Sequence, residues 1–234
     1  MSALEDMTGF MALLCARQIR AGDHFGIGVA APVPLLGARL ALALHARDAV
    51  PLGRNLPGGV PLTGSLDFTA LVLQGRVDLF FLSAAQIDVR GGINLQYAGH
   101  GERRRAFFGA FAAPVYYPAI PRTILFREEH SPRVFVERVD YLTALPPQHS
   151  ADPARVITSK AILRLEKAHG GFVLESIHPG ETLESVRAAT GFPLPLAPDF
   201  HQTPLPTDAE RTTLAALRQM DQAFGGSAPD HGQG

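Results

Sequence analysis

Apolar positions along this chain follow two patterns, one with the period of a helix and one made of short continuous runs. Near the start, Leu4, Met7, Met11 and Cys15 recur at helical spacing, which predicts an amphipathic first helix. The apolar run over residues 77–82 is short enough for a strand that is buried on both faces. Further strands are predicted over residues 24–30, 93–97, 123–126, 134–139, 155–158 and 172–177. Further helices are predicted over residues 34–45, 66–73, 183–189 and 207–220.

Local signals at the ends of these segments define the fold class. Pro34 suits the first turn of a helix, and the Pro-Gly-Gly sequence at 57–59 marks a break. Thr207 and Glu210 have the spacing of a capping box at the start of the last helix. Strands that alternate with helices predict an α/β fold with a mainly parallel sheet flanked by helices. We expect a single domain over residues 1–224, followed by a disordered polar tail over 225–234.

The composition argues against several functional classes. The 234 residues are 46% hydrophobic and 18% charged, which is ordinary for a chain with one good core. A net charge of −1 argues against a nucleic-acid partner, whose binders usually carry a strong basic excess. No run reaches the roughly 18 apolar residues of a membrane helix, and the first 20 residues do not have the pattern of a signal peptide. With the single cysteine Cys15, these features predict a cytoplasmic protein without a membrane partner.

Metal and cofactor motifs are weak in this chain. The nine histidines show no metal-ligand spacing, and there is no second cysteine to complete a site. The sequence Gly26-Ile27-Gly28 is followed by two prolines and lacks the context of a dinucleotide-binding turn. Cys15 falls on the apolar face of the first helix, which favours buried packing over nucleophilic work. We therefore expect no metal and no separate cofactor.

Several motifs in a fixed order carry a resemblance to one family. Residues 83–88 read Ser-Ala-Ala-Gln-Ile-Asp, and residues 91–94 read Gly-Gly-Ile-Asn. Residues 133–143 read Arg-Val-Phe-Val-Glu-Arg-Val-Asp-Tyr-Leu-Thr, and Val-Ile-Thr and His-Pro-Gly-Glu-Thr follow at 156–158 and 178–182. Over roughly residues 22–222, the chain resembles the B (beta) subunit of class I CoA-transferases of the glutaconate CoA-transferase type.

This resemblance implies a fold, a partner and a substrate class. The implied fold is the CoA-transferase (NagB/RpiA-like) type of α/β domain. Members of this kind pair with an A-type (alpha) subunit, as a heterodimer or heterotetramer, and their active site lies between the two subunits. The implied substrate is an acyl-CoA, so coenzyme A enters as part of the substrate. Alone, the chain is expected to be catalytically incomplete.

One position departs from the family where its chemistry begins. After a motif that corresponds to residues 45–48, family members have a Glu-Asn-Gly or Glu-Ser-Gly turn, whose glutamate attacks the thioester and carries CoA. Counting forward from His45 without gaps puts Arg54 in the glutamate position and Asn55 after it. A guanidinium cannot be that nucleophile at neutral pH. Arg54 is therefore either a catalytic group that grips a carboxylate or polarises the thioester, or an exposed arginine in a degenerated turn.

The other candidate site residues follow from the resemblance. Small residues let the main chain approach a ligand, and Ser83, Ala84 and Gln86 correspond to the family loop that lines the CoA and acyl site. The alternative is a buried strand end with small residues chosen for packing. Asn55, Asn94 and Gly109 are assigned to the same substrate and CoA site. Gly109 lies in residues 107–113, where three phenylalanines replace a glycine-rich family loop and indicate either an apolar wall for a bulky acyl group or core packing.

Three functional hypotheses remain from the sequence. The first is a subunit of an enzyme that acts on an acyl-CoA without a glutamyl-CoA intermediate, as family members of hydrolase (ring-cleaving) or decarboxylase type do. The second is a genuine acyl-CoA:carboxylate CoA-transferase in which another carboxylate serves. The third is a non-catalytic subunit that binds CoA or stabilises an active partner.

Overall fold

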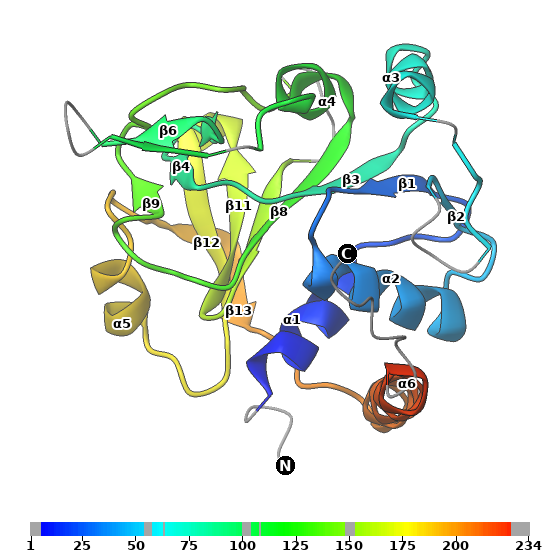
Figure 1. The fold of residues 1–234 in the computed structure, drawn as a ribbon. Coiled ribbons are helices and arrows are strands. Elements are labelled where there is room, and N and C mark those ends of the chain that lie inside the picture. The colour runs from blue at the N-terminus through cyan, green and yellow to red at the C-terminus, as the bar shows by residue number, and fades with distance from the viewer. Residues whose placement is uncertain are drawn as a thin grey trace, which may run out of the picture.

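The computed structural model describes residues 6–53, 58–62, 64–99, 104–107, 109–147 and 153–225 of the chain. Within these residues, eight strands form one sheet in the order β13-β12-β11-β10-β8-β3-β1-β2 (Figure 1). In chain order they are β1 (His24–Ile27), β2 (Val50–Pro51), β3 (Leu79–Leu82), β8 (Arg122–Arg127), β10 (Arg155–Thr158), β11 (Ala161–Glu166), β12 (Gly171–Ile177) and β13 (Leu196–Gln202). Strand β11 runs antiparallel to its two neighbours, and the other described pairs of this sheet are parallel. The predicted α/β fold with a mainly parallel sheet is confirmed.

Both faces of the central strands are covered, which explains their continuous apolar sequence. Helices α1 (Met7–Ala16) and α2 (Pro32–Leu44) pack on one face, where Leu79 and Phe81 of β3 join their cluster. The alternate β3 residues Phe80 and Leu82 point into the cluster on the other face. That face carries α3 (Ser65–Leu73) and α4 (Ala113–Ala119) (Figure 1).

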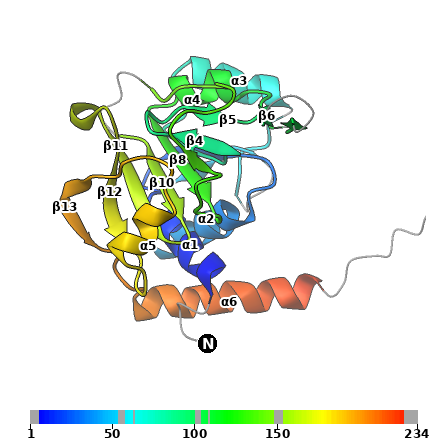
Figure 2. The same cartoon turned by 90° about the vertical axis from the view of Figure 1, so that its left-hand side faces the viewer.

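Shorter elements complete the fold around the second face. A three-stranded sheet joins β4 (Gln86–Asp88), β5 (Ile93–Asn94) and β9 (Phe135–Val136), and a hairpin joins β6 (Tyr97–Ala98) and β7 (Arg105–Ala106). The 3-10 helix η2 (Lys167–His169) connects β11 and β12, and α5 (Leu183–Ala188) follows β12. Helix α6 (Asp208–Gly225) lies along the α1 and α2 side of the molecule (Figure 2). No helix within the described parts of the chain is both long and apolar enough to span a bilayer.

Three predicted strands are shorter than expected. The strand predicted over 24–30 ends at Ile27, because Ala30 has a φ of 55° and turns the chain into α2. The segment 93–97 divides into β5 and the start of β6. The segment 134–139 is reduced to β9, because its neighbour β4 has only three residues to pair with. Strands β11 and β13 and helix α4 were not predicted, and the tail 226–234 lies outside the described residues.

Helix α6 is held against the rest of the domain by charged side chains. Arg17, directly after α1, donates from Nε and Nη2 to the two carboxylate oxygens of Glu210, both at 2.8 Å. It also donates to the backbone oxygens of Pro204 and Leu205 at 3.0 and 3.1 Å. The hydrogen bond from Arg17 lowers the pKa of Glu210 to about 2. The predicted capping box is confirmed as well, with Thr207 N donating to Glu210 at 2.7 Å and Glu210 N donating to the Thr207 hydroxyl at 3.2 Å.

Replacing Arg17 with Ala is expected to loosen α6 without unfolding the sheet. The variant loses four hydrogen bonds but frees groups that water can reach, so we expect a loss of about 1–2 kcal/mol and faster amide exchange in residues 208–222. Arg211→Ala is the matched control, because Arg211 pairs with Asp208 within the same helix. Hydrogen exchange that stays unchanged in Arg17→Ala would contradict this role.

Candidate active site

The carboxyl ends of the parallel strands meet at one edge of the sheet, which is where open α/β sheets bind ligands. Strand β1 runs out into Gly28, whose N–H donates to the Phe81 oxygen of β3 at 3.0 Å. Strand β3 runs out into Ser83, and β8 ends at Arg127. At the end of β2, Gly53 and Val60 are joined by a 3.0 Å hydrogen bond between Gly53 N and Val60 O. Arg54 and Asn55 follow Gly53 and lie outside the described residues, so their assigned roles stay predictions.

The turn after β3 is built of small, mostly covered residues. Ala84 is buried, and Ser83 and Ala85 are half-buried. Ala85 N donates to the Asn94 oxygen at 2.9 Å, which ties this turn to β5. Ser83 and Ala84 thus lie at the carboxyl edge of the sheet. Contact between these residues and CoA stays a prediction.

Gln86 and Asn94 lie together and bind each other. The Asn94 Nδ2 donates to Gln86 Oε1 at 2.7 Å, and Gln86 Nε2 donates to Asp140 Oδ2 at 3.1 Å. The backbone N–H of Asp140 also donates to Gln86 Oε1, at 3.0 Å. Asn94 is further fixed by its Oδ1, which accepts from the backbone N–H of Gln96 and of Tyr97 at 3.0 and 3.3 Å. Both amides are buried, so they position the surrounding turns, and their direct contact with substrate stays a prediction.

Asp88 and Tyr117 stabilise the next turn of the chain. Asp88 Oδ1 accepts from Arg90 N at 3.0 Å and from Gly92 N at 2.8 Å. Burial raises the pKa of the Asp88 carboxyl, against the lowering effect of these backbone donors. The Tyr117 hydroxyl donates to the Gly91 oxygen at 3.0 Å. Asp88 therefore fixes the turn over residues 88–92.

The phenylalanines of residues 107–113, the segment that contains Gly109, are not all packed in the core. Phe111 is 86% exposed, so core packing is the wrong explanation for this side chain. Gly109 lies against Leu95, whose Cδ2 would be 3.2 Å from a Cβ at Gly109. Leu66 on α3 is 82% exposed, and α3 is joined to α4 by a 2.9 Å hydrogen bond between Thr69 and Tyr116. Large apolar side chains are thus exposed around α3 and α4.

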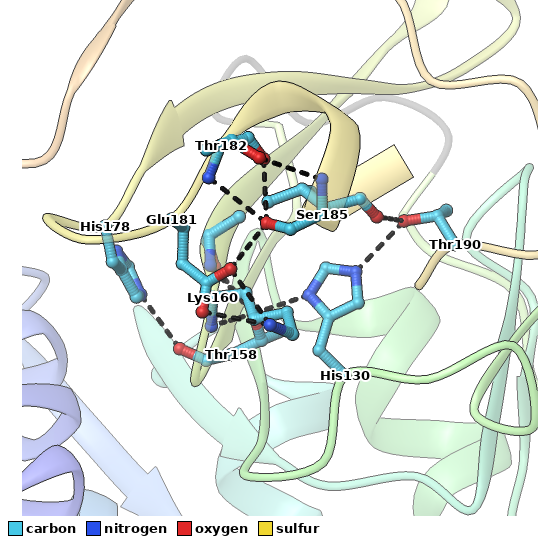
Figure 3. Close-up of polar contacts among 10 residues, drawn as sticks. His130, Thr158, Lys160, His178, Glu181, Thr182, Ser185 and Thr190 are labelled. Atoms are coloured by element: carbon cyan, nitrogen blue, oxygen red, sulfur yellow. Dashed lines mark hydrogen bonds and ion pairs between the residues drawn. The ribbon is translucent and has the colours of Figure 1, made fainter. Parts of the chain in front are cut away.

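A network of polar side chains lies at the same edge of the sheet, at or just after the carboxyl ends of β8, β10 and β12 (Figure 3). His130 follows β8 and lies between two hydroxyls, with Nδ1 2.8 Å from Thr158 Oγ1 and Nε2 3.0 Å from Thr190 Oγ1. The Thr190 hydroxyl donates to the Val186 oxygen at 2.8 Å, so it must accept a hydrogen bond from Nε2. The Thr158 hydroxyl lies 2.8 Å from Nδ1 and 3.0 Å from the Ala161 oxygen, and its single proton can be donated to only one of them.

His178 has the same arrangement one strand further along. Its Nε2 is 2.9 Å from the Thr158 backbone oxygen, which can only accept. Its Nδ1 therefore accepts from the Thr203 hydroxyl at 2.9 Å. Burial is the main reason that the pKa values of both His130 and His178 fall to about 4. His178 is thus held at both ring nitrogens, and no sequence motif pointed to His130.

The outer part of this network is an ion pair between Lys160 and Glu181. Lys160 Nζ lies 2.9 Å from both carboxylate oxygens of Glu181, and the two side chains are 29% and 22% exposed. Burial alone would raise the pKa of Glu181, but hydrogen bonds from Ser185 and Lys160 outweigh it and lower that pKa. Glu181 is therefore a carboxylate at neutral pH, at the surface of this edge.

Other reactive groups lie away from this edge. Cys15 is fully buried in α1, and burial raises the pKa of its thiol, so the expected packing role is confirmed. Among the residues that the structure describes, no group of three or more His, Cys, Asp or Glu side chains is placed to hold a metal ion.

Comparisons with known proteins found CoA-transferases and a decarboxylase. No family model matches the chain. The B-type (beta) subunit of 3-oxoadipate CoA-transferase from Pseudomonas knackmussii is 27% identical over 250 residues, covering 92% of this chain and 94% of that protein. The decarboxylase AibA/AibB is 25% identical, with a TM-score of 0.79 over 90% of this chain and 93% of that chain. Glutaconate coenzyme A-transferase from Acidaminococcus fermentans is 21% identical, with a TM-score of 0.71 over 88% and 92%, and this likeness supports the fold alone.

Proposed function

Because the chain belongs to the class I CoA-transferase family, as a B-type subunit, we propose that it acts with an A-type subunit on an acyl-CoA without forming a glutamyl-CoA intermediate. The reaction is of the hydrolase (ring-cleaving) or decarboxylase type. The likeness to a decarboxylase at 25% identity supports this choice.

The observation that carries the proposal is the lack of a suitable glutamate. No glutamate occurs between Glu5 and Glu102. Shifting the alignment by a few residues therefore does not bring a glutamate to the position after β2. Asp23, Asp48 and Asp78 each precede a strand and therefore lie at the amino edge of the sheet, opposite the proposed site. A carboxylate nucleophile must sit where the thioester binds. The first half of the chain has no such group in the family position.

The partner subunit would complete the site. The side chains of Leu66 and Phe111 are more than four-fifths exposed around α3 and α4. Large exposed apolar side chains that lie near one another commonly mark an interface. We place the A-type subunit on this side, in a heterodimer or heterotetramer, where it supplies the general base that this chain lacks.

Replacing Arg54 with Ala in the co-expressed pair is expected to lower kcat/KM about 10- to 100-fold, because a charge-assisted contact to the acyl-CoA is lost. Arg54→Lys should recover only part of the rate, since Lys cannot make the bidentate contact. Arg47→Ala is the matched control, because Arg47 is exposed before β2 at the opposite edge. Wild-type rates in Arg54→Ala, with the complex intact, would remove Arg54 from the site.

The reaction class is tested with the same pair on a panel of acyl-CoAs, with and without acetate or succinate. We expect acyl-CoA to be consumed equally well without an acceptor acid, and intact-mass measurement to find no CoA adduct on this chain. A new acyl-CoA that forms only with an acceptor would instead establish a transferase. Glu128 and Glu129, which follow β8 at the carboxyl edge, would then be the first candidate nucleophiles. Acyl-CoA binding without turnover would favour the non-catalytic subunit.

A further inference from the structure

One hydrogen-bond donor of Arg127 has no acceptor among the described residues. It is the last residue of β8, in the middle of the sheet, and its side chain is 34% exposed. Its Nε is buried and has no hydrogen-bond partner among the described residues. Leaving a buried donor unpaired is costly, so such groups are uncommon unless something else binds them.

The register of the sheet places Arg127 beside the turn after β3. Leu125 pairs with Leu82 and both pack in the cluster under α3 and α4. Arg127 lies two residues further along β8 and therefore on the same face. It is next to the point where β3 runs out into Ser83 and Ala84, and it pairs with Thr158 on the other side.

The nearest acidic side chain does not neutralise Arg127 well. Glu129 Oε2 is 3.6 Å from Arg127 Nη2, which is beyond a hydrogen bond. Glu129 instead accepts from Arg133 Nη2 at 2.7 Å and from the Ser131 hydroxyl at 2.6 Å. These two donors are the main reason that the pKa of Glu129 is lowered. The carboxylate is therefore occupied, and Arg127 keeps most of its capacity for another anion.

We propose that Arg127 binds an oxyanion of the acyl-CoA, either a carboxylate of the acyl part or the 3′-phosphate of the CoA part. This inference rests on the proposed function and adds a specificity-determining residue to it. The exposed end of the guanidinium meets the oxyanion first. A small rotation, which gives up the long contact to Glu129, turns the Nε–Nη2 edge toward the ligand and pairs the unused donor.

The test uses the co-expressed two-subunit complex and CoA thioethers that cannot react. S-(3-carboxypropyl)-CoA and S-butyl-CoA differ in the terminal carboxylate, and CoA and dephospho-CoA differ in one phosphate. Dissociation constants are measured by calorimetry for the wild type, Arg127→Gln and Arg127→Lys. Arg76→Gln is the matched control, because Arg76 is exposed before β3 at the opposite edge of the sheet.

If a carboxylate is bound, Arg127→Gln should weaken the carboxypropyl thioether about 10- to 100-fold and leave S-butyl-CoA unchanged. If the phosphate is bound, Arg127→Gln should weaken the binding of CoA by a similar factor and leave the binding of dephospho-CoA unchanged. Arg127→Lys should restore part of either loss, and Arg76→Gln should match the wild type.

Unchanged affinities in Arg127→Gln, with the wild type binding normally, would overturn the role of Arg127 and leave the proposed function standing. Loss of the assembled complex in both Arg127 variants would overturn it too, because the residue would then be structural. A wild-type complex that binds none of the four compounds would overturn the proposed function itself.

Discussion

Lowering the pH from 7.5 to 5 is expected to reduce the free energy of unfolding by about 4 kcal/mol, because two buried histidines must stay neutral in the folded protein. His130 is 6% exposed and His178 is 0% exposed. Both pKa values are lowered to about 4, mainly by burial, and nearby Lys160 lowers that of His130 further. The contacts of His178 fit a neutral ring, in which Nε2 donates to the Thr158 backbone oxygen and Nδ1 faces the Thr203 hydroxyl.

The direction of the pH effect follows from proton uptake by the unfolded chain. An unfolded histidine has a pKa of about 6.5, so between pH 6.5 and 4 the unfolded state binds more protons than the folded state. The contribution of each ring is therefore complete above pH 6.5 and is lost as the pH falls toward 4. At pH 5, each ring has lost about 2 kcal/mol.

The measurement is urea unfolding at several pH values between 7.5 and 4.5. His130→Gln and His178→Asn should each be less stable at pH 7.5 but should depend less on pH, because one titrating group has gone. His201→Gln is the control, since His201 is exposed on β13 and should leave the slope unchanged. A wild-type stability that stays constant from pH 7 to 5 would show that neither ring is held neutral.

Much of the fold is encoded in local patterns that the sequence displays directly. Strands β3, β8, β10 and β12 are covered on both faces or nearly so, and their apolar runs were predicted almost to the residue. Strand β11 was missed because Arg164 and Glu166 interrupt its apolar pattern. In the folded chain Arg164 pairs with Glu166 in the same strand at 2.5 Å and with Asp199 of β13 at 2.7 Å. Helix α4 was missed because Pro118 lies inside it.

In the candidate site too, some features follow from the local sequence, and others depend on contacts between residues that are distant in the chain. The small residues after β3 lie at the carboxyl edge, and the motif assigned them to the loop that lines the CoA site. The motif did not reveal that Gln86 and Asn94 bind each other, because that pairing depends on β4 and β5 folding back as a hairpin. Arg127 and His130 carried no sequence signal, since each depends on neighbours from other strands. Arg54 and Asn55 lie outside the described residues and remain sequence predictions.

Replacing Asp23 with Asn is expected to destabilise the protein by about 3–5 kcal/mol, because it leaves the charge of Arg122 buried without a counter-charge. Asp23 and Arg122 are 7% and 6% exposed. Asp23 Oδ2 accepts from Arg122 Nη2 and from the backbone N–H of Arg20 at 2.7 Å. Arg122 Nε has no partner among the described residues, so this donor does not help to neutralise the charge. The pair joins the turn before β1 to the first residue of β8.

Two further variants separate this buried pair from an ordinary surface contact. Asp78→Asn is the control, because Asp78 and His24 are about half exposed and their contact should be worth less than about 1 kcal/mol. Asp23→Leu combined with Arg122→Met removes both charges and should be more stable than Asp23→Asn, since apolar replacement of a buried pair is often neutral. Stability is measured by urea unfolding at pH 7.5, well above the pKa values of His130 and His178. If the double variant is no more stable than Asp23→Asn, the loss comes from packing and hydrogen bonds of Asp23 and not from the unpaired arginine.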